Sequence, residues 1–162
     1  MPAPLVKIDL EFPYTRSVGP VIGAYLDGLE AGRLLASRAG DRTLSPPLEY
    51  DPATGASVES ELVEVGPEGV VTSWTWVDSP NPNHPLDRPF AFALIQLDGA
   101  DTAMVHVVDG PRDAISTGVR VRPRWRDERT GYVTDVECFT VVSVGEPGNP
   151  ASRERPSAEV VK

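Results

Sequence analysis

A strand–turn–strand pattern runs through Glu61-Leu62-Val63-Glu64-Val65-Gly66-Pro67-Glu68-Gly69-Val70-Val71-Thr72-Ser73-Trp74-Thr75-Trp76-Val77. Valine, threonine and tryptophan favour strands, and the glycine and proline residues mark the turn. Four further runs of this kind follow, each bounded by turn residues, at 90–97, 102–108, 119–125 and 132–143. About five strands, one with a bulge or a sharp bend, are enough to close a small barrel. We therefore expect a mainly β fold, with a β-sandwich as the alternative.

Composition narrows the classes of protein that this chain can belong to. It has 162 residues, among them 17 prolines and 14 glycines, which favours short strands and turns over long helices. The net charge of −9 disfavours nonspecific nucleic-acid binding, because such binding needs a cationic surface. No apolar run approaches the roughly 20 residues of a membrane span, and no signal-peptide pattern is present. We expect a cytoplasmic protein of one ordinary domain size.

One segment near the N-terminus has helical periodicity. A single apolar stripe is formed by Val18, Val21, Ile22, Tyr25, Leu26 and Leu29. Ser17 is the predicted cap, Pro20 suits the first turn, and Gly28 or Gly32 is expected to end the helix. Such a stripe packs either on its own domain or on a partner, and the sequence leaves both possibilities open.

The segment from residue 33 to residue 55 lacks a single period. Its diprolyl step Pro46-Pro47 blocks helix formation, so we expect two small hairpins or an ordered loop. Beyond residue 145 the sequence is polar and broken by prolines, which predicts a disordered tail over residues 146–162. The expected organisation is a helix with hairpins over 1–57 and a barrel over 58–145.

Four arginines alternate along one predicted strand: Arg120, Arg122, Arg124 and Arg126. Alternation places them on one strand face, where they could grip a phosphate group such as those of coenzyme A. A hairpin pairing Arg122 with Glu137 and Arg124 with Asp135 would instead neutralise much of the stripe. We favour the ion-paired face and keep phosphate binding as the alternative.

Three other features carry candidate functional residues. Trp74 and Trp76 share one strand face, which suits either core packing or a subunit surface. The twelve-residue loop 78–89 holds His84 and Arg88, for which contact with a ligand or a partner is the preferred role. His106 is expected to be a structural residue within a strand.

The inventory of catalytic and metal-binding groups is short. Cys138 is the only cysteine, which excludes an intramolecular disulfide and a multi-thiolate metal site, and no Gly-rich phosphate loop, nucleophile elbow or pair of catalytic carboxylates is found. We therefore expect no catalytic residues, no metal site and no resident cofactor.

The order of several pieces resembles a known family. The helix leads into Gly32-Arg33-Leu34-Leu35-Ala36-Ser37-Arg38, Pro46-Pro47 and Tyr50-Asp51-Pro52-Ala53-Thr54-Gly55, and then into the runs 61–75 and 89–97. This order resembles the acyl-CoA-associated OB-fold family, in which an N-terminal helix and a rubredoxin-like zinc ribbon precede a five-stranded OB barrel. Where that family carries two C-x-x-C knuckles, this chain has no cysteine, so the resemblance implies a degenerate ribbon without zinc.

What the resemblance implies is an accessory subunit. Zinc-less members resemble those paired with thiolase-like aldolases that shorten steroid side chains carried as coenzyme A esters. The partner would hold the catalytic residues, and the complex would be a carbon–carbon lyase of steroid degradation, expected as a two-plus-two heterotetramer. The expected partner interface comprises Val21, Ile22, Tyr25, Leu29, Trp74 and Trp76. Contacts to acyl-CoA or to the substrate channel are expected from Arg33, Arg38, His84 and Arg88.

Two alternatives from other classes stay open. An OB-fold module could bind single-stranded nucleic acid by stacking bases on Trp74, Trp76 and Phe92. A stand-alone acyl-CoA hydratase or lyase could use His84 and Asp87 for proton transfer. The net charge weighs against the first, and the lack of a nearby nucleophile weighs against covalent catalysis in the second.

Overall fold

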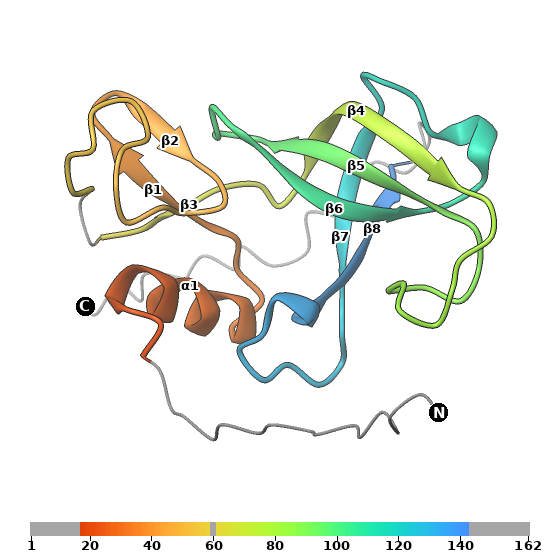
Figure 1. The fold of residues 1–162 in the computed structure, drawn as a ribbon, viewed down its shortest axis with the longest axis horizontal. Helices are drawn as coiled ribbons and strands as arrows, with labels where there is room; N and C mark the ends of the chain where they lie inside the picture. The colour runs from red at the N-terminus through yellow and green to blue at the C-terminus, as the bar shows by residue number, and fades with distance from the viewer. Residues whose placement is uncertain (1–16, 59–60, 143–162) are drawn as a thin grey trace, which may run out of the picture.

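The computed structural model describes residues 17–58 and 61–142. One helix and a small three-stranded sheet lie beside a five-stranded barrel (Figure 1). The expected mainly β fold with a closed five-stranded barrel is confirmed. The predicted tail at 146–162 lies outside the described residues.

Helix α1 spans Pro20–Glu30 and begins with proline in its first turn, as expected. The predicted cap is wrong: Gly19 is the N-cap residue, and the Ser17 hydroxyl only accepts a 3.3 Å hydrogen bond from the Gly19 amide. Gly32 adopts φ 72°, which lets the Arg33 amide turn back to the Gly28 carbonyl at 2.8 Å. The left-handed conformation of Gly32 ends the helix. Glycine suits this position because a residue with a side chain would be strained there.

The segment after α1 forms a small sheet that we call the ribbon. Its strands are β1 (Leu35–Ala39), β2 (Arg42–Leu44) and β3 (Val63–Glu64), in the order β2-β1-β3. A second small hairpin is closed by an isolated bridge between Tyr50 and Ser57, so the two expected hairpins are present. Strand β3 does not pair across the turn at 66–69 as expected, because its partner is β1. The run 61–65 thus joins the ribbon sheet and not the barrel sheet.

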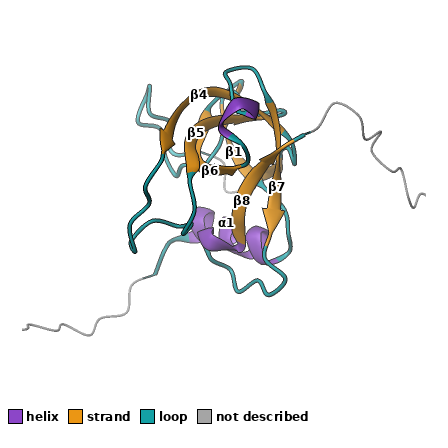
Figure 2. Ribbon diagram, turned by 90° about the vertical axis from the view of Figure 1, so that its right-hand side faces the viewer, coloured by secondary structure: helices purple, strands orange, loops and turns teal. Residues whose placement is uncertain are grey.

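The barrel contains β4 (Gly69–Val77), β5 (Phe90–Leu97), β6 (Ala103–Asp109), β7 (Arg120–Trp125) and β8 (Val136–Val141). Its closed order is β4-β5-β6-β8-β7, and only the β6–β8 pair is parallel. The predicted bulge lies in β4, where the register shifts between Val71 and Ser73. Short 3₁₀ turns occupy η1 (Arg112–Ala114) and η2 (Val133–Asp135). In Figure 2 the barrel strands curve around a common interior, with α1 beneath them.

One hydrophobic core joins the helix, the ribbon and the barrel. Leu29 of α1 and Ala36 of β1 belong to the same buried cluster as Ile95 and Phe139 of the barrel. The Arg129 side chain, in the loop before η2, also donates a 2.9 Å hydrogen bond to the Glu30 carbonyl at the end of α1. The helix is therefore fixed to the barrel by both its apolar face and its C-terminus.

Candidate functional site

Three exposed apolar side chains belong to α1's start and to the adjoining ribbon segment. Val18 is 53% exposed, Leu48 40% and Tyr50 59%. The carboxylate of Glu49 lies against Gly19, which places the helix start beside residues 48–50. We call Val18, Leu48 and Tyr50 the helix–ribbon surface. Large apolar groups left exposed in this way are typical of a protein-binding surface.

The helix residues expected at a partner interface are mostly inside the chain. Val21, Tyr25 and Leu29 are buried, and Ile22 is half-buried. At these positions the stripe packs on the chain's own barrel and ribbon, whereas Val18 at its start is exposed. Val21, Tyr25 and Leu29 therefore offer almost no surface to a partner.

Both tryptophans of β4 pack against the barrel core. Trp74 lies opposite Ala93 and Trp76 lies opposite Ala91, so a small residue on β5 makes room for each large ring. Phe92 belongs to a second cluster with Phe90, Val107 and Cys138. The three aromatic residues considered for base stacking thus do not form one platform.

The four polar residues expected near a ligand fall into two groups. Arg33 and Arg38 lie on the ribbon side, where Arg33 pairs with Glu64 at 2.9 Å and Arg38 is exposed on β1. His84 and Arg88 lie in the loop after β4. The His84 ring packs edge-on against Phe90 and Phe92, and its Nδ1 accepts a 3.1 Å hydrogen bond from the Asn81 amide.

The proposed proton-transfer pair is not assembled in this loop. The Asp87 carboxylate lies 3.7 Å from the Arg88 guanidinium. Within the described part of the chain no hydrogen bond joins Asp87 to His84. The arrangement gives the hydratase or lyase alternative no support.

An ion-pair network holds the same loop against the barrel. Asp109 of β6 accepts hydrogen bonds from Arg88 at 2.6 Å and from Arg124 at 3.0 Å, and Arg124 also pairs with Glu137 at 2.7 Å. The Arg88 hydrogen bond is the main reason that the pKa of Asp109 lies below its usual range. Arg88 is therefore engaged in anchoring the loop.

Two arginines of the stripe, Arg120 and Arg124, form ion pairs, and one of the predicted acids, Glu137, pairs with Arg124. Arg122 lies opposite Thr140 and Arg124 opposite Cys138, so the predicted pairings with Glu137 and Asp135 are wrong. Arg120 binds Asp98 through two 2.6 Å hydrogen bonds and Glu68 through one of 2.9 Å. These contacts favour the structural role of the stripe over phosphate binding.

The register differs because a tight turn replaces the expected start of the last strand. The buried Asp135 carboxylate accepts hydrogen bonds from the amides of Thr130, Gly131 and Tyr132. Burial disfavours the charged carboxylate, but these amide hydrogen bonds outweigh it and lower the pKa of Asp135. Residues 132–135 are thereby held in a turn, and β8 begins only at Val136.

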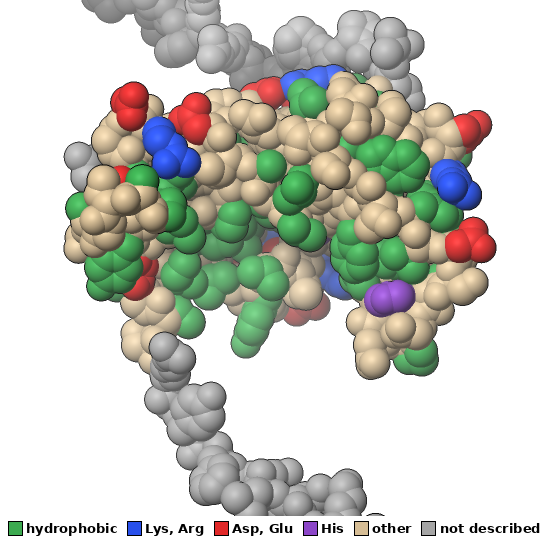
Figure 3. All heavy atoms as spheres, turned by 45° about the horizontal axis from the view of Figure 1, so that its top comes forward, with side chains coloured by type: hydrophobic (Ala, Val, Ile, Leu, Met, Phe, Trp, Pro, Cys, Tyr) green, Lys and Arg blue, Asp and Glu red, His purple; other side chains and the backbone are tan. Residues whose placement is uncertain are grey.

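An apolar groove of about 730 Å³ lies where β6 and β8 separate. We call it the seam groove; it is lined by Tyr25, Pro46, Pro85, Phe92, residues 103–107, Arg126, Val133, Thr134, Val136 and Glu137. Val105 and Val133, which line it, are 65% and 63% exposed. On the face shown in Figure 3, hydrophobic side chains gather in the middle and charged ones lie mostly toward the edges.

Sequence reasoning missed the seam groove, although one signal was present. Residues 103–108 (Ala-Met-Val-His-Val-Val) are apolar on both faces except for His106. A half-exposed antiparallel strand normally alternates apolar and polar residues. Val105, on the outer face of this strand and 65% exposed, departs from that pattern.

His106 lines the seam groove and is expected to make the stability of the fold depend on pH. Burial lowers its pKa, although a weak contact with the Val107 carbonyl opposes the shift, and its ring lies 5.2 Å from that of Phe139. Below the ordinary histidine pKa of about 6.5 the unfolded chain binds a proton that folded His106 does not. We expect the free energy of unfolding to fall as the pH drops from about 7 toward the lowered pKa.

This expectation is checked by urea unfolding between pH 7.5 and 5 for the wild type, His106→Gln and His84→Gln. His106→Gln should flatten the pH dependence in this range, whereas His84→Gln should retain it. An unchanged slope in His106→Gln would assign the proton uptake to another group.

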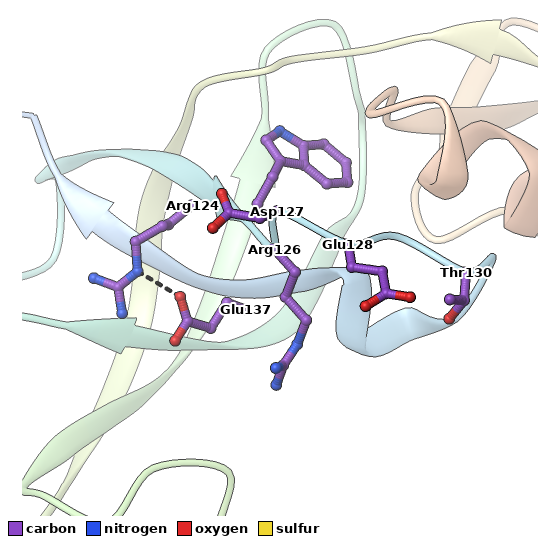
Figure 4. A pocket seen from close by; sticks show the side chains of 7 residues that line it. Arg124, Arg126, Asp127, Glu128, Thr130 and Glu137 are labelled. Atoms are coloured by element: carbon purple, nitrogen blue, oxygen red, sulfur yellow. Dashed lines mark hydrogen bonds and ion pairs between the residues drawn. The ribbon is translucent and has the colours of Figure 1, made fainter.

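A second hollow, of about 780 Å³, adjoins the seam groove and is polar. Figure 4 shows Arg124 bonded to Glu137, with Arg126, Asp127 and Glu128 projecting in different directions from the loop after β7. Arg126 donates a 2.7 Å hydrogen bond to the Thr134 carbonyl. The mixed charges and separate directions of these side chains do not form a paired-carboxylate or triad geometry.

The ribbon turns do not have the donors of a structural zinc site. Asp51 begins the segment Asp51-Pro52-Ala53-Thr54-Gly55, which stands where the resembled family has its second C-x-x-C knuckle. Its carboxylate accepts hydrogen bonds from the Ala53 amide at 2.9 Å and the Thr54 hydroxyl at 2.8 Å. These two hydrogen bonds lower the pKa of Asp51, that from Ala53 most. Over residues 17–58 and 61–142 no group of three potential metal ligands comes together. A tetrahedral thiolate site does not fit these residues.

No helix in the described ranges is long and apolar enough to cross a membrane.

The barrel region of this chain is similar to that of known proteins. The family model of the C-terminal OB-fold domain of ChsH2 matches residues 62–126. A solved structure described as an Ltp2-ChsH2(DUF35) aldolase is 22% identical with a TM-score of 0.54, covering 78% of this chain and 97% of that chain. A DUF35-family protein of unknown function from Sulfolobus solfataricus is 19% identical with a TM-score of 0.57, covering 76% and 83%.

At these identities the two solved structures establish a shared fold. No curated protein shows a significant sequence match. The family model covers the strands from β3 to β7, including the bulged β4 and the arginine strand. The chain therefore has an OB fold, and its residues 62–126 are similar to the C-terminal OB-fold domain of ChsH2.

Proposed function

We propose that this chain is a noncatalytic accessory subunit that binds and stabilises a catalytic partner. The observation that carries the proposal is the helix–ribbon surface, where Val18, Leu48 and Tyr50 are each at least 40% exposed. Tyrosine is one of the residues enriched among the few that supply most of the binding energy of protein interfaces. The fold shared with the ChsH2 chain of an Ltp2-ChsH2 aldolase supports the same role.

The partner in this proposal is a thiolase-fold aldolase, and the reaction is retro-aldol cleavage of a steroid side-chain β-hydroxyacyl-CoA. The catalytic residues belong to the partner, and the coenzyme A thioester is a substrate of the complex. The barrel lies near the acyl-CoA entrance and shapes the channel, with the loop of His84 and Arg88 as one wall. The network centred on Asp109 supports this role, because it fixes that loop to β6.

In the proposed assembly two copies of this chain flank a dimeric partner. Arg38, exposed on β1, is the ribbon residue best placed to meet a coenzyme A phosphate, since Arg33 is already paired with Glu64. Zinc has no part in this assembly.

The test is co-expression of the full chain with a thiolase-fold protein encoded beside it, followed by size-exclusion chromatography with light scattering. We expect a stable heteromer with a mass of two plus two chains and cleavage of a β-hydroxyacyl-CoA only by the complex. A folded chain that stays monomeric with every such partner would contradict the proposal. Turnover by the isolated chain would contradict its noncatalytic role.

A further inference from the structure

One edge of strand β6 opens onto the seam groove. Strand β6 pairs with β5 along residues 103–108, but within the described residues it pairs with β8 only at Val108 and Asp109. Residues 103–107 all line the groove, and the start of β8 and the η2 turn form the opposite wall. Among residues 17–58 and 61–142, therefore, nothing pairs with this edge of β6 over residues 103–107, and the edge faces an apolar cavity.

The chemistry of this edge favours a peptide over an apolar small molecule. A free strand edge presents backbone amide and carbonyl groups, which an added strand satisfies and a hydrocarbon cannot. The cavity beside it takes apolar side chains, because Phe92, Met104, Val105, Val133 and Val136 line it. An extended segment with apolar residues at every second position meets both requirements.

The chain itself contains such a segment. Residues 5–14 read Leu-Val-Lys-Ile-Asp-Leu-Glu-Phe-Pro-Tyr and lie outside the described residues. Val6, Ile8, Leu10 and Phe12 alternate with Lys7, Asp9 and Glu11, so one face of an extended strand is apolar and the other polar. From this match we propose that residues 5–14 dock along the free edge of β6 as an added strand, with their apolar face in the seam groove.

The length of chain permits this docking within one molecule. Ten extended residues span about 33 Å, whereas the five residues of the free edge span about 17 Å. The segment enters α1 at Pro20, about 8 Å along the helix axis from Tyr25, which itself lines the groove. Residues 15 and 16, together with the part of the segment that extends beyond the free edge, therefore lead from the helix start to the groove.

Charge at the rim agrees with this occupant. Arg126 lines the groove and, among the described residues, makes a hydrogen bond to the Thr134 carbonyl but no ion pair. Its remaining guanidinium donors suit Glu11 or Asp9 on the polar face of the docked segment. Glu137 at the same rim is already paired with Arg124.

The test uses amide hydrogen exchange of peptides covering residues 103–107 in three full-length proteins. These are the wild type, Ile8→Ser/Leu10→Ser and the matched control Lys7→Ser/Asp9→Ser. We expect exchange at 103–107 to rise by about tenfold or more in Ile8→Ser/Leu10→Ser and to stay within about threefold of wild type in the control. Peptides from β5, which is paired on both sides, should be unchanged in all three proteins.

Three outcomes would overturn the proposal. Equal exchange in all three proteins would show that residues 5–14 do not cover the edge. Protection that disappears on dilution, together with a dimer in light scattering, would assign the edge to a second copy. Protection that follows a bound small molecule in native mass spectrometry would assign the groove to that ligand. Because the exchange is measured on the isolated chain, failure here and failure of partner binding are distinguishable.

Discussion

Replacing Phe139 with alanine is expected to lower the free energy of unfolding by about 3–5 kcal/mol. Phe139 is fully buried and joins both neighbours of β8, lying opposite Val108 of β6 and Pro123 of β7. Strands β6 and β8 share only two paired positions, so the ring also fills the place where the barrel closes. A loss of this size is a large share of the roughly 5–15 kcal/mol that stabilises a typical domain.

The measurement is urea unfolding followed by tryptophan fluorescence at pH 7.5. Leu94→Ala is the matched control, because Leu94 lies on β5 but is 39% exposed. It should cost about 1 kcal/mol or less. Similar losses for both variants would show that closure at the β6–β8 contact contributes no more than an exposed sheet position.

Tyr50→Glu is expected to weaken partner binding by about 30-fold to 1,000-fold while leaving the isolated chain folded. The Tyr50 side chain is 59% exposed, and the Tyr50–Ser57 bridge belongs to the backbone, so glutamate is tolerated in the free chain. In a complex it would bury a charge within an apolar contact. The dissociation constant from calorimetry or interferometry checks this expectation.

Tyr132→Glu provides the control for that experiment. Tyr132 is 65% exposed but lies on the barrel loop before η2, away from the ribbon segment of Tyr50. Wild-type affinity in Tyr132→Glu and loss in Tyr50→Glu would place the interface on the helix–ribbon surface. The reverse result would move it to the barrel. Tyr25 is unsuitable for such a test, because its burial means that substitution there disturbs the core.

The local sequence was sufficient to predict most of the barrel. The period of two and the glycine turns are properties of neighbouring residues, and both are present in the structure. A bulge or sharp bend was expected in one strand without saying which, and the structure has a bulge in β4. Strand pairing was less predictable: β3 joins β1 of the ribbon, although it directly precedes a turn leading to β4. The pairing partner of a two-residue strand is determined by packing across the whole chain and not by the strand's own sequence pattern.

The candidate site was predictable only in part, for two physical reasons. The apolar stripe of α1 was correctly located, but periodicity cannot distinguish a face packed on its own domain from one that meets a partner. The pairing of Arg120 with Asp98 and Glu68 joins three different segments and depends on barrel closure. The seam groove likewise exists only because β6 and β8 are paired at two positions, Val108 and Asp109 of β6, and lie apart over the preceding residues 103–107.

The Asp51 turn has a consequence for the conditions under which the ribbon keeps its shape. Its closing groups are a carboxylate, a hydroxyl and backbone amides, none of which is removed by chelators or oxidised by peroxide. The lone thiol, Cys138, is buried, and burial raises its pKa to about 11, so little reactive thiolate forms at neutral pH. The surface next to this turn therefore stays assembled through swings in zinc supply and redox potential that would unfold a thiolate-ligated ribbon.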